Sequence, residues 1–476
     1  MAVRSPQQIS VLLLLHVHKP AINAVTHSFR RHYTDYTARV AETKTSSNLQ
    51  KIPQPSGLER LSTLCLWRNL ILGAAFTSPI LFKIGFGAMG YIANSRSRFL
   101  NPDSNPLLRA IIKPLVYDQF CAGTNQYEIG VTRSEIQRMG FAGVILCYGK
   151  EIQVSGASNE IHSTGAGNTD QSVEIDMWKK GNLETLDMIG EGDWVGMKLT
   201  GAGPGIATAL MNNEDPPQQF VDAMDAICHK ARDQNCRIWV DAEQQVMQAA
   251  IDRWTIDFMR KHNRNGKALV YNTNQAYLKS SREKLKHQLS LADKEGWTLG
   301  IKLVRGAYIA NDKRELIHDT KQDTDDSYNG LVRDLLSGTN LGFEPLNFPR
   351  MQLFLAGHNP ESVDRAWELV QQLSATGQLK VLPDFGQLQG MADELGCKIV
   401  QRCEDVTKEN AAAGVKGVVP AVYKCLTWGS LQECMQYLIR RAVENSGGVE
   451  RMKDGMAANW RELKRRSMVR LGGRSV

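Results

Sequence analysis

The feature that most constrains the fold of this chain is a regular alternation of β-rich runs and helical stretches, which begins near Phe141. Eight short runs are separated by segments long enough for a helix with its connecting loops. Parallel strands joined by helices form a covered sheet, and eight such units close into a barrel. The predicted fold class is therefore α/β, a (βα)8 TIM-like barrel. The predicted strands cover residues 142–147, 194–199, 237–240, 268–272, 299–304, 351–355, 379–382 and 418–423.

Polar residues stand at, or just after, the ends of these predicted strands. The C-terminal ends of barrel strands meet at one rim, where ligands bind, so we expect these side chains to gather there. The rim residues are Lys198, Asp241, Gln275, Lys302, Arg305, His358 and Gln387, followed on the helix after the eighth strand by Arg440 and Arg441. The pattern predicts one polar site at the barrel mouth.

Several of these residues also have a purely structural interpretation. Lys198 is compatible with a lysine that extends along an apolar surface to reach water. Asp241 is placed to cap the helix that follows it. Gln275 is placed to pack a loop, and His358, before Asn-Pro, is placed in a turn. Taken one at a time, these positions leave structural and functional roles open.

The fifth predicted strand carries two cations, Lys302 and Arg305, among apolar residues. A charge that is taken out of water needs a partner. These two side chains are therefore harder to explain as solvated surface, and they indicate a partner inside the barrel mouth.

The segment after the eighth strand is predicted to be a helix with two adjacent arginines near its end. Ser430 is suited to the N-cap position, and Glu433 three residues later completes a capping box. Arg440 and Arg441 can hold a planar carboxylate with paired hydrogen bonds. The alternative is that they only complement the dipole at a solvated helix end.

Three glycines after the second predicted strand, Gly201, Gly203 and Gly205, are close to a dinucleotide-binding pattern but do not complete it. The GxGxxG spacing requires a glycine where Ile206 stands. We interpret the segment as a turn into a helix.

Composition excludes several other classes of function. The net charge of the 476-residue chain is +7, but much of the excess lies near its two ends. No long basic stripe alternates with aromatic residues, so nucleic acid is not expected as a partner. The nine cysteines include no CxxC pair, which indicates neither a disulfide framework nor a zinc site. No bound metal is predicted.

Residues 1–50 have the composition of a mitochondrial transit peptide. They are rich in arginine, serine and threonine, and no acidic residue precedes Asp35. That pattern is typical of import signals. A short secretory apolar region at residues 11–15 and a disordered tail are the alternatives.

Residues 61–93 are the most apolar part of the chain, and Pro79 divides them into two runs. Neither run reaches the roughly 20 residues that a membrane-spanning helix needs. We predict two short apolar helices, which either pack against the barrel or lie in a membrane surface.

Five motifs occur in a characteristic order. They are Asp241-Ala-Glu243-Gln244, Lys302-Leu-Val-Arg305-Gly-Ala-Tyr308, Ala356-Gly-His358-Asn359, Phe385-Gly-Gln387-Leu-Gln-Gly390-Met391 and Arg440-Arg441-x-x-Glu444-Asn445. With them, the chain from about Leu61 onward resembles the flavin-dependent proline dehydrogenase family in its eukaryotic, fungal-like mitochondrial form. The resemblance implies a distorted (βα)8 barrel with an N-terminal helical region. It also implies oxidation of L-proline to Δ1-pyrroline-5-carboxylate by hydride transfer to FAD. Ubiquinone would take the electrons at the matrix side of the inner mitochondrial membrane, which the protein would contact peripherally.

The same resemblance implies roles for individual residues. The residues that would bind the substrate are Lys198, Arg440 and Arg441, at its carboxylate, and Cys425, against its ring. Asp241 and Lys302 would lie at the reacting centre. The residues that would hold FAD are Gln275, Arg305, Gly306, Ala307 and His358, with Gln387 at the rim beside it.

Two residues depart from the commonest family pattern. Bacterial members usually carry arginine at the position of Lys302, whereas eukaryotic members resemble this chain. Cys425 stands where the family usually has a tyrosine that packs against the substrate ring. A smaller side chain enlarges the pocket, so relaxed specificity or weaker proline binding is expected. The alternatives are therefore a dehydrogenase of a related imino acid such as hydroxyproline, or a weakly active flavin-binding paralogue that serves as a sensor or scaffold.

The predicted domain organisation has four parts. They are a transit or disordered segment (1–50), a helical apolar region with membrane contact as one interpretation (51–140), the FAD-binding barrel (141–458) and a basic C-terminal tail (459–476). The tail is expected to be solvated, and contact with anionic lipid is the alternative.

Overall fold

The computed structural model describes residues 57–95, 97–149, 153–154, 161–162, 170–309, 311–414, 419–446 and 449–472. All of them belong to one compact unit, Pro55–Val476. The predicted transit segment lies outside the described residues.

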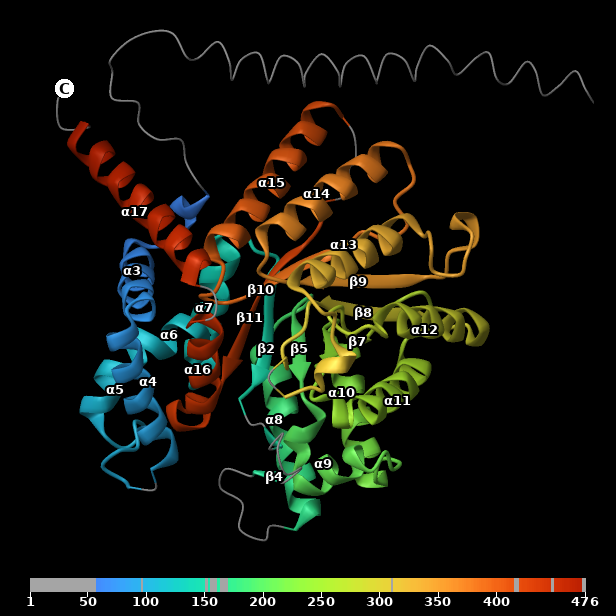
Figure 1. The fold of residues 1–476 in the computed structure, drawn as a ribbon, viewed down its shortest axis with the longest axis horizontal. Helices are drawn as coiled ribbons and strands as arrows, with labels where there is room; N and C mark the ends of the chain where they lie inside the picture. The colour runs from blue at the N-terminus through green and yellow to red at the C-terminus, as the bar shows by residue number, and fades with distance from the viewer. Residues whose placement is uncertain are drawn as a thin grey trace, which may run out of the picture. The chain divides into compact units, whose positions relative to one another are not determined.

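Within the described residues, eight parallel strands form a closed barrel with helices around it (Figure 1). β11 pairs with β2 and closes the sheet. The strands, in their order around the barrel, are β2 (Gly143–Tyr148), β5 (Trp194–Met197), β6 (Arg237–Val240), β7 (Val270–Gln275), β8 (Leu299–Val304), β9 (Met351–Ala356), β10 (Asp384–Leu388) and β11 (Val422–Trp428). The helices that follow them are α8 (Gln171–Met188), α9 (Pro204–Met211), α10 (Gln218–Asp233), α11 (Gln245–His262), α12 (Ser281–Glu295), α13 (Lys321–Ser337), α14 (Pro360–Ala375), α15 (Asp393–Ala412) and α16 (Leu431–Ser446). The predicted barrel is confirmed.

Two strands lie later in the chain than predicted. The seventh is β10 rather than residues 379–382, and the eighth is β11 rather than residues 418–423. The apolar run before β10 packs an incoming loop instead, because Val381 is buried and the Lys380 amide donates to the Leu336 carbonyl of α13. Apolar residues mark burial whether or not the backbone is extended, so the prediction took this loop for the strand.

The barrel is distorted at β11, where a ninth strand joins the sheet. β1 (Cys121–Gly123) pairs with the end of β11, and Cys121 lies opposite Thr427. β10 has already ended at this level, since its last partner on β11 is Cys425. β1 thus covers an edge that β10 leaves open.

An aromatic layer fills the middle of the barrel. Its inward-facing side chains come from five strands and are Trp194, Trp239, Tyr271, Phe354 and Tyr423. The centroid of Trp194 lies 4.7 Å from that of Tyr271 and 5.0 Å from that of Phe354, both edge to face. Such contacts stabilise aromatic clusters beyond simple burial. The layer separates the two ends of the barrel.

An ion pair lies at the N-terminal ends of the strands, below this layer. The Arg237 guanidinium stacks on Trp194 with its central carbon 3.9 Å from the ring centroid. It donates to Asp384 Oδ2 and to the Tyr423 hydroxyl, each at 2.7 Å. These contacts tie β6 to β10 and β11.

The N-terminal region contains the two predicted apolar helices, α3 (Thr63–Thr77) and α4 (Pro79–Asn94). They are followed by α5 (Pro106–Ile112), η3 (Lys113–Tyr117), α6 (Asp118–Phe120) and α7 (Gln126–Arg138). In Figure 1, α3, α4 and α5 lie together on the α16 side of the barrel. No single described helix has both the length and the hydropathy to cross a membrane, although α3 and α4, bent by 100°, meet those criteria as a pair.

The last helix, α17 (Val449–Gly472), packs along α3. Trp460 meets Trp67 of α3 with ring centroids 6.4 Å apart. α17 runs across residue 458, where the barrel and the basic tail were predicted to divide.

A buried ion pair anchors α3 to the barrel. Lys424 on β11 donates to Asp393 at the start of α15 at 2.7 Å, and Asn69 of α3 donates to the same carboxylate at 3.3 Å. Burial alone would raise the pKa of Asp393, but the Lys424 ammonium outweighs it and the pKa is lowered. The N-terminal region is therefore fixed to the barrel through a charged contact.

Candidate active site

Lys302 and Asp241 form an ion pair at the C-terminal ends of the strands. Lys302 lies in β8, and Asp241 directly follows β6. Lys302 Nζ donates to Asp241 Oδ1 at 2.5 Å and lies 3.9 Å from the centroid of Trp239. Lys302 is only 8% exposed. An ammonium held by one carboxylate above an aromatic face keeps its charge at a fixed point in the mouth.

Lys198 directly follows β5 and faces the same mouth. Its ammonium donates to the Tyr308 hydroxyl at 3.3 Å. Trp178 of α8 holds the Lys198 carbonyl through its indole N–H at 3.1 Å. Tyr308 belongs to the loop after β8, so the Lys198 ammonium contacts another part of the rim. It does not simply extend along the surface into bulk water, as the structural alternative would have it.

Glu243, quoted in a motif but given no role, joins two loops of the rim. Its carboxylate accepts from the Thr200 hydroxyl at 2.5 Å and from the Thr200 amide at 3.3 Å. The loop after β5 is thereby held against the loop after β6, which carries Asp241.

Arg305, Gly306 and Ala307 form the start of the loop after β8, next to Gln275 at the end of β7. The Ala307 amide donates to Gln275 Oε1 at 3.4 Å. Gly306 has φ 145°, and a Cβ there would lie 2.4 Å from the Tyr277 ring. Only glycine fits this backbone against Tyr277.

The Arg305 side chain is directed towards α13 and α14. It forms an ion pair with Asp325 and donates to the Ser362 hydroxyl at 3.0 Å. Its guanidinium carbon lies 5.6 Å from the centroid of Tyr328. Arg305 thus connects the rim to the helices outside it.

His358, two residues after β9, accepts a hydrogen bond from the Leu388 amide at its Nε2, at 3.0 Å. A ring nitrogen that accepts carries no proton, so the proton is on Nδ1. His358 is placed at the rim between β9 and β10.

Gln387 faces the helices from within β10 rather than the interior, and its predicted place beside a flavin stays a prediction. It lies inside β10, where Phe385 and Gln387 face the helices while Asp384 and Gly386 face the interior. Its Oε1 lies 3.2 Å from the position of a Cβ on Gly396 of α15. The predicted strand ended at residue 382 and β10 ends at Leu388, so Gln387 was taken for a loop residue.

Helix α16 carries Arg440 and Arg441, the first half-buried and the second buried. Arg441 lies over the ring of Tyr437, with its guanidinium carbon 5.0 Å from the centroid, and its Nη1 lies 3.8 Å from the sulfur of Met391. Met391 belongs to the loop after β10, so the helix leans towards the barrel mouth.

The start of α16 is held from two sides. The predicted capping box is present, because Glu433 accepts from the Ser430 amide at 2.8 Å and Ser430 from the Glu433 amide at 3.3 Å. Asp103, from the N-terminal region, also accepts from the Leu431 and Gln432 amides at 3.0 Å each. The helix that presents the two arginines is therefore anchored by a distant part of the chain.

Cys425 lies in β11 and faces the interior beside Cys147 of β2. Tyr437 of α16 lies near both thiols, and burial followed by the nearby Cys121, Cys425 and Cys147 raises its pKa. Sequence reasoning missed Tyr437, Trp239 and Cys147. The two-residue alternation within β6 and β2 could have placed Trp239 and Cys147 on the interior face.

A comparison with known proteins decides the family. The model of the proline dehydrogenase family matches residues 147–454, a span that includes the strands from β5 to β11 and most of the rim residues. The chain belongs to the proline dehydrogenase family.

Relatives support the assignment with different coverage. A probable mitochondrial proline dehydrogenase of Schizosaccharomyces pombe is 25% identical, over 87% of this chain and 90% of that protein. Proline dehydrogenase 1 of Homo sapiens, also named mitochondrial, is 32% identical over 52% of this chain, but this match covers only 39% of the human protein. A hydroxyproline dehydrogenase of Bos taurus is 26% identical over 76% of this chain and 83% of that protein.

The solved structure of proline utilization A from Bdellovibrio bacteriovorus shares the fold. Its TM-score is 0.58 at 16% identity, over 82% of this chain and 40% of that one. The likeness supports the barrel architecture of the proline dehydrogenase family and nothing finer.

The rim of this family member fits a flavin by its donors. Gln275 is 2% exposed, and its Nε2 has no hydrogen-bond partner among the described residues. A flavin ring offers carbonyl and nitrogen acceptors, and cations nearby favour its electron-rich reduced form. Among the residues that the structure describes, no three His, Cys, Asp or Glu side chains gather as a metal site would require.

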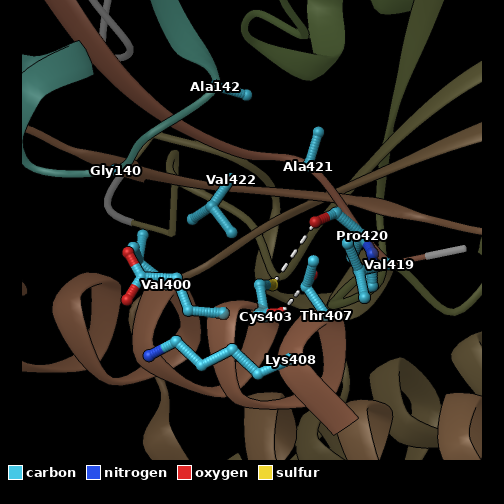
Figure 2. Close-up of a pocket in the computed structure, with 11 residues that line it drawn as sticks. Gly140, Ala142, Val400, Cys403, Thr407, Lys408, Val419, Pro420, Ala421 and Val422 are labelled. Carbon is cyan, nitrogen blue, oxygen red and sulfur yellow. Dashed lines mark hydrogen bonds between the residues drawn. The ribbon is translucent and has the colours of Figure 1, made fainter. Parts of the chain in front are cut away.

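A separate hollow of about 450 Å³ lies at the other end of the barrel (Figure 2). α15 lines one side, and the segments that lead into β2 and β11 line the other. Within it, Cys403 donates to the Pro420 carbonyl at 3.4 Å. Because Ala142 and Pro420 precede their strands, this hollow is remote from the strand ends that carry Lys302 and Lys198.

Proposed function

We propose that this protein oxidises L-proline to Δ1-pyrroline-5-carboxylate, with FAD as the hydride acceptor and ubiquinone as the onward electron acceptor. The observation that carries the proposal is the Lys302–Asp241 pair at the mouth of a proline dehydrogenase barrel, with Arg441 presented from above by α16. The mouth is cationic, as binding of an amino-acid carboxylate requires.

The substrate carboxylate binds to Lys198, Arg440 and Arg441. Guanidinium groups hold a carboxylate with two parallel hydrogen bonds, and a lysine adds a point charge. Tyr308 fixes the direction of the Lys198 ammonium. Holding the carboxylate at one end orients the substrate ring and removes rotational freedom from the chemical step.

FAD is held by Gln275, Arg305, Gly306, Ala307 and His358. The buried Gln275 Nε2 supplies a donor, and the backbone at Gly306 approaches closely because it has no side chain. When bound, the flavin supplies the hydride acceptor. Lys302 stabilises negative charge as it develops, and Asp241 keeps the ammonium in place.

We further propose a mitochondrial location at the matrix side of the inner membrane, reached through the apolar face of α3, α4 and α5. The mitochondrial names of relatives support the compartment. Exposed apolar side chains support surface contact, and they include Leu64, Ile71, Ile80, Ile84 and Leu107. No residue of α4 is fully buried. Met89, Ile92 and Ala93 pack towards α16, whereas Ile80 and Ile84 are exposed.

Vesicle binding tests the membrane surface. Ile80→Glu with Ile84→Glu should reduce binding of the full chain to vesicles with cardiolipin, measured by flotation. The matched control is Leu346→Glu, which also replaces an exposed apolar residue but lies before β9. Equal binding of all three proteins would refute contact through α4.

The reaction is tested by the absorption spectrum of the purified protein. Added proline should bleach the flavin bands, and a soluble quinone should restore them. Arg440→Met with Arg441→Met should abolish bleaching at low proline concentration, whereas Arg365→Met on the surface of α14 should not. A protein that stays colourless after refolding with excess FAD, or a double variant with unchanged turnover, would refute the proposal. A yellow protein that proline does not bleach would instead support the sensor or scaffold.

Hydroxyproline is a second candidate substrate because of Cys425. A tyrosine at this place would fill space that a thiol leaves, and a bovine relative is named a hydroxyproline dehydrogenase. If the pocket is enlarged, flavin reduction by 4-hydroxyproline should be measurable, and Cys425→Tyr should suppress it more than reduction by proline. Exclusion of hydroxyproline by the unaltered protein would rule this candidate out.

A further inference from the structure

Two thiols meet inside the barrel mouth. The sulfur atoms of Cys147 on β2 and Cys425 on β11 are 3.8 Å apart, close enough for one thiol to donate a hydrogen bond to the other. All nine cysteines of the chain are free. A disulfide has its sulfurs about 2.0 Å apart. Closing the pair therefore needs a relative movement of under about 2 Å, which side-chain rotation and a small strand shift can share.

Strand pairing places the two side chains together. Ile145 and Tyr423 face the aromatic layer, so Cys147 and Cys425, each two residues later, face the interior as well. Cys425 lies opposite Ile145, and Cys147 lies opposite Thr427. The two cysteines are thus diagonal neighbours on one face, whose side chains lie within reach of each other.

The pair lies next to the proposed catalytic group. A Cβ on Gly196 would be 2.6 Å from Cys147 Sγ and 2.5 Å from the indole nitrogen of Trp239. The thiol and the indole therefore share the space above Gly196. Trp239 in turn supports the Lys302 ammonium at 3.9 Å. Movement of the Cys147 sulfur changes the packing beneath that ammonium.

We propose that Cys147 and Cys425 are a site of reversible oxidation, where a peroxide converts the two thiols to a disulfide and so slows turnover. The regulatory part rests on the proposed function, since proline oxidation is the turnover that slows. The disulfide chemistry itself does not depend on the substrate.

The reaction balances with one hydrogen peroxide per pair. The Cys425 sulfur attacks one peroxide oxygen, the O–O bond breaks, and one water leaves as a sulfenic acid forms. The Cys147 sulfur then attacks the Cys425 sulfur, the S–O bond breaks, and the oxygen leaves as a second water with the Cys147 proton. Two electrons pass from the sulfurs to the peroxide, and a dithiol reductant returns them by exchange.

The order of the two cysteines follows from their surroundings. The hydrogen bond with Cys425, together with burial, raises the pKa of the Cys147 thiol well above its ordinary value. A thiol that resists ionisation is a poor nucleophile for starting the reaction. We therefore assign the first step to Cys425 and the second to Cys147, and the disulfide formed is the same in either order.

A second pair provides an internal comparison. Cys121 and Cys434 are both buried in one apolar cluster, and burial raises the pKa of Cys121. Cys147 and Cys425 are half-buried and lie at the mouth. The half-buried pair should oxidise before the fully buried one.

The test treats the flavin-loaded full chain with hydrogen peroxide, quenches it with an alkylating reagent, and maps linked peptides without reductant. The variants are Cys147→Ser and the matched control Cys403→Ser, which also removes a half-buried thiol but at the opposite end of the barrel. Turnover of each protein is measured before treatment, after it, and after dithiothreitol.

The expected result is a peptide linking Cys147 to Cys425 and a loss of at least tenfold in turnover that dithiothreitol reverses, in the unaltered protein and in Cys403→Ser. A misplacement of about 1 Å at a catalytic group can cost about a hundredfold. Cys147→Ser should lose the link and resist reversible inactivation. Alkylation of both cysteines after peroxide, or a link only between Cys121 and Cys434, would overturn the proposal. Because peptide mapping needs no substrate, a protein inactive on proline would still show or lack the link.

Discussion

Two ion pairs on opposite sides of one aromatic layer make the most instructive comparison in this molecule. Below the layer, Arg237 stacks on Trp194 at 3.9 Å and pairs with Asp384. Above it, Lys302 lies over Trp239 at the same 3.9 Å and pairs with Asp241. Each cation has one aspartate and one tryptophan as partners, and the two aspartates are similarly exposed.

The difference lies in how many hydrogen bonds each cation makes. Arg237 donates to Asp384, to the Tyr423 hydroxyl and to the Gly192 carbonyl. Lys302 makes one hydrogen bond, to Asp241, among the described residues. The hydrogen bonds of Arg237 reach β10, β11 and the turn before β5, so this cation links several segments, whereas Lys302 is held by one carboxylate at the mouth. The comparison therefore distinguishes a charge that links several strands from a charge that is proposed to meet a ligand, by the number of segments each one contacts.

Replacing Lys302 should give the largest effect on turnover. In Lys302→Met we expect a loss of about 10²–10³-fold in kcat, the cost of removing one preorganised charge stabiliser. The free energy of unfolding should fall by less than in Arg237→Met, because one hydrogen bond is lost rather than three, although Asp241 also loses its partner. Steady-state kinetics and urea unfolding measure the two quantities. A variant with near-normal kcat would show that the upper pair is also structural.

Replacing Arg237 should reverse that balance. Arg237→Met removes three hydrogen bonds from a charged group and leaves Asp384 without its partner, so the free energy of unfolding should fall by about 1.5–3 kcal/mol. The kcat of the folded fraction should change little. The double variant Arg237→Met with Asp384→Leu should recover part of the stability, since no unpaired charge then remains. An Arg237→Met variant that lost kcat but kept its free energy of unfolding would contradict a purely structural role for Arg237.

Replacing Arg441 tests whether the substrate carboxylate is bound by paired guanidinium hydrogen bonds or by positive charge alone. Arg441→Lys keeps the charge but loses the paired hydrogen bonds, so the KM for proline should rise about tenfold with a smaller change in kcat. Lys453→Arg in α17 serves as a control for charge-preserving change. An unchanged KM would place Arg441 outside the carboxylate site.

The partly exposed ion pair of Arg60 and Glu404 should give the smallest change in the free energy of unfolding. Arg60 donates to Glu404 of α15 at 2.6 Å, and this hydrogen bond lowers the pKa of Glu404. A carboxyl with a lowered pKa in the folded state stabilises the protein above its unfolded pKa, and this contribution is lost as pH falls through the folded value. Glu404→Gln should therefore lower stability by about 0.2–1 kcal/mol at pH 7 and by less at pH 3. Unfolding curves at both pH values measure this, and equal losses would contradict it.

The barrel and most of the rim could be predicted from the sequence, because the C-terminal ends of all strands in a closed parallel sheet meet at one rim. Lys198, Asp241 and Lys302 could be assigned to the mouth on that basis alone. The orientation of the Gln387 side chain could not be predicted, because it depends on where the strand begins and ends. A shift of one residue moves a side chain to the other face of a strand. Cys425 was predicted as a pocket residue, but its contact with Cys147 depends on the register between β2 and β11, which no pattern in either strand reveals.

The anchoring of α16 by Asp103 has a consequence for how the enzyme matures. The two backbone amides that Asp103 caps begin the helix bearing both arginines, yet Asp103 is synthesised long before any barrel strand. A barrel expressed by itself from residue 141 would lack this carboxylate at the start of α16, the helix that carries Arg440 and Arg441. Removal of a segment that included Asp103 would therefore take away the two capping hydrogen bonds at the start of α16.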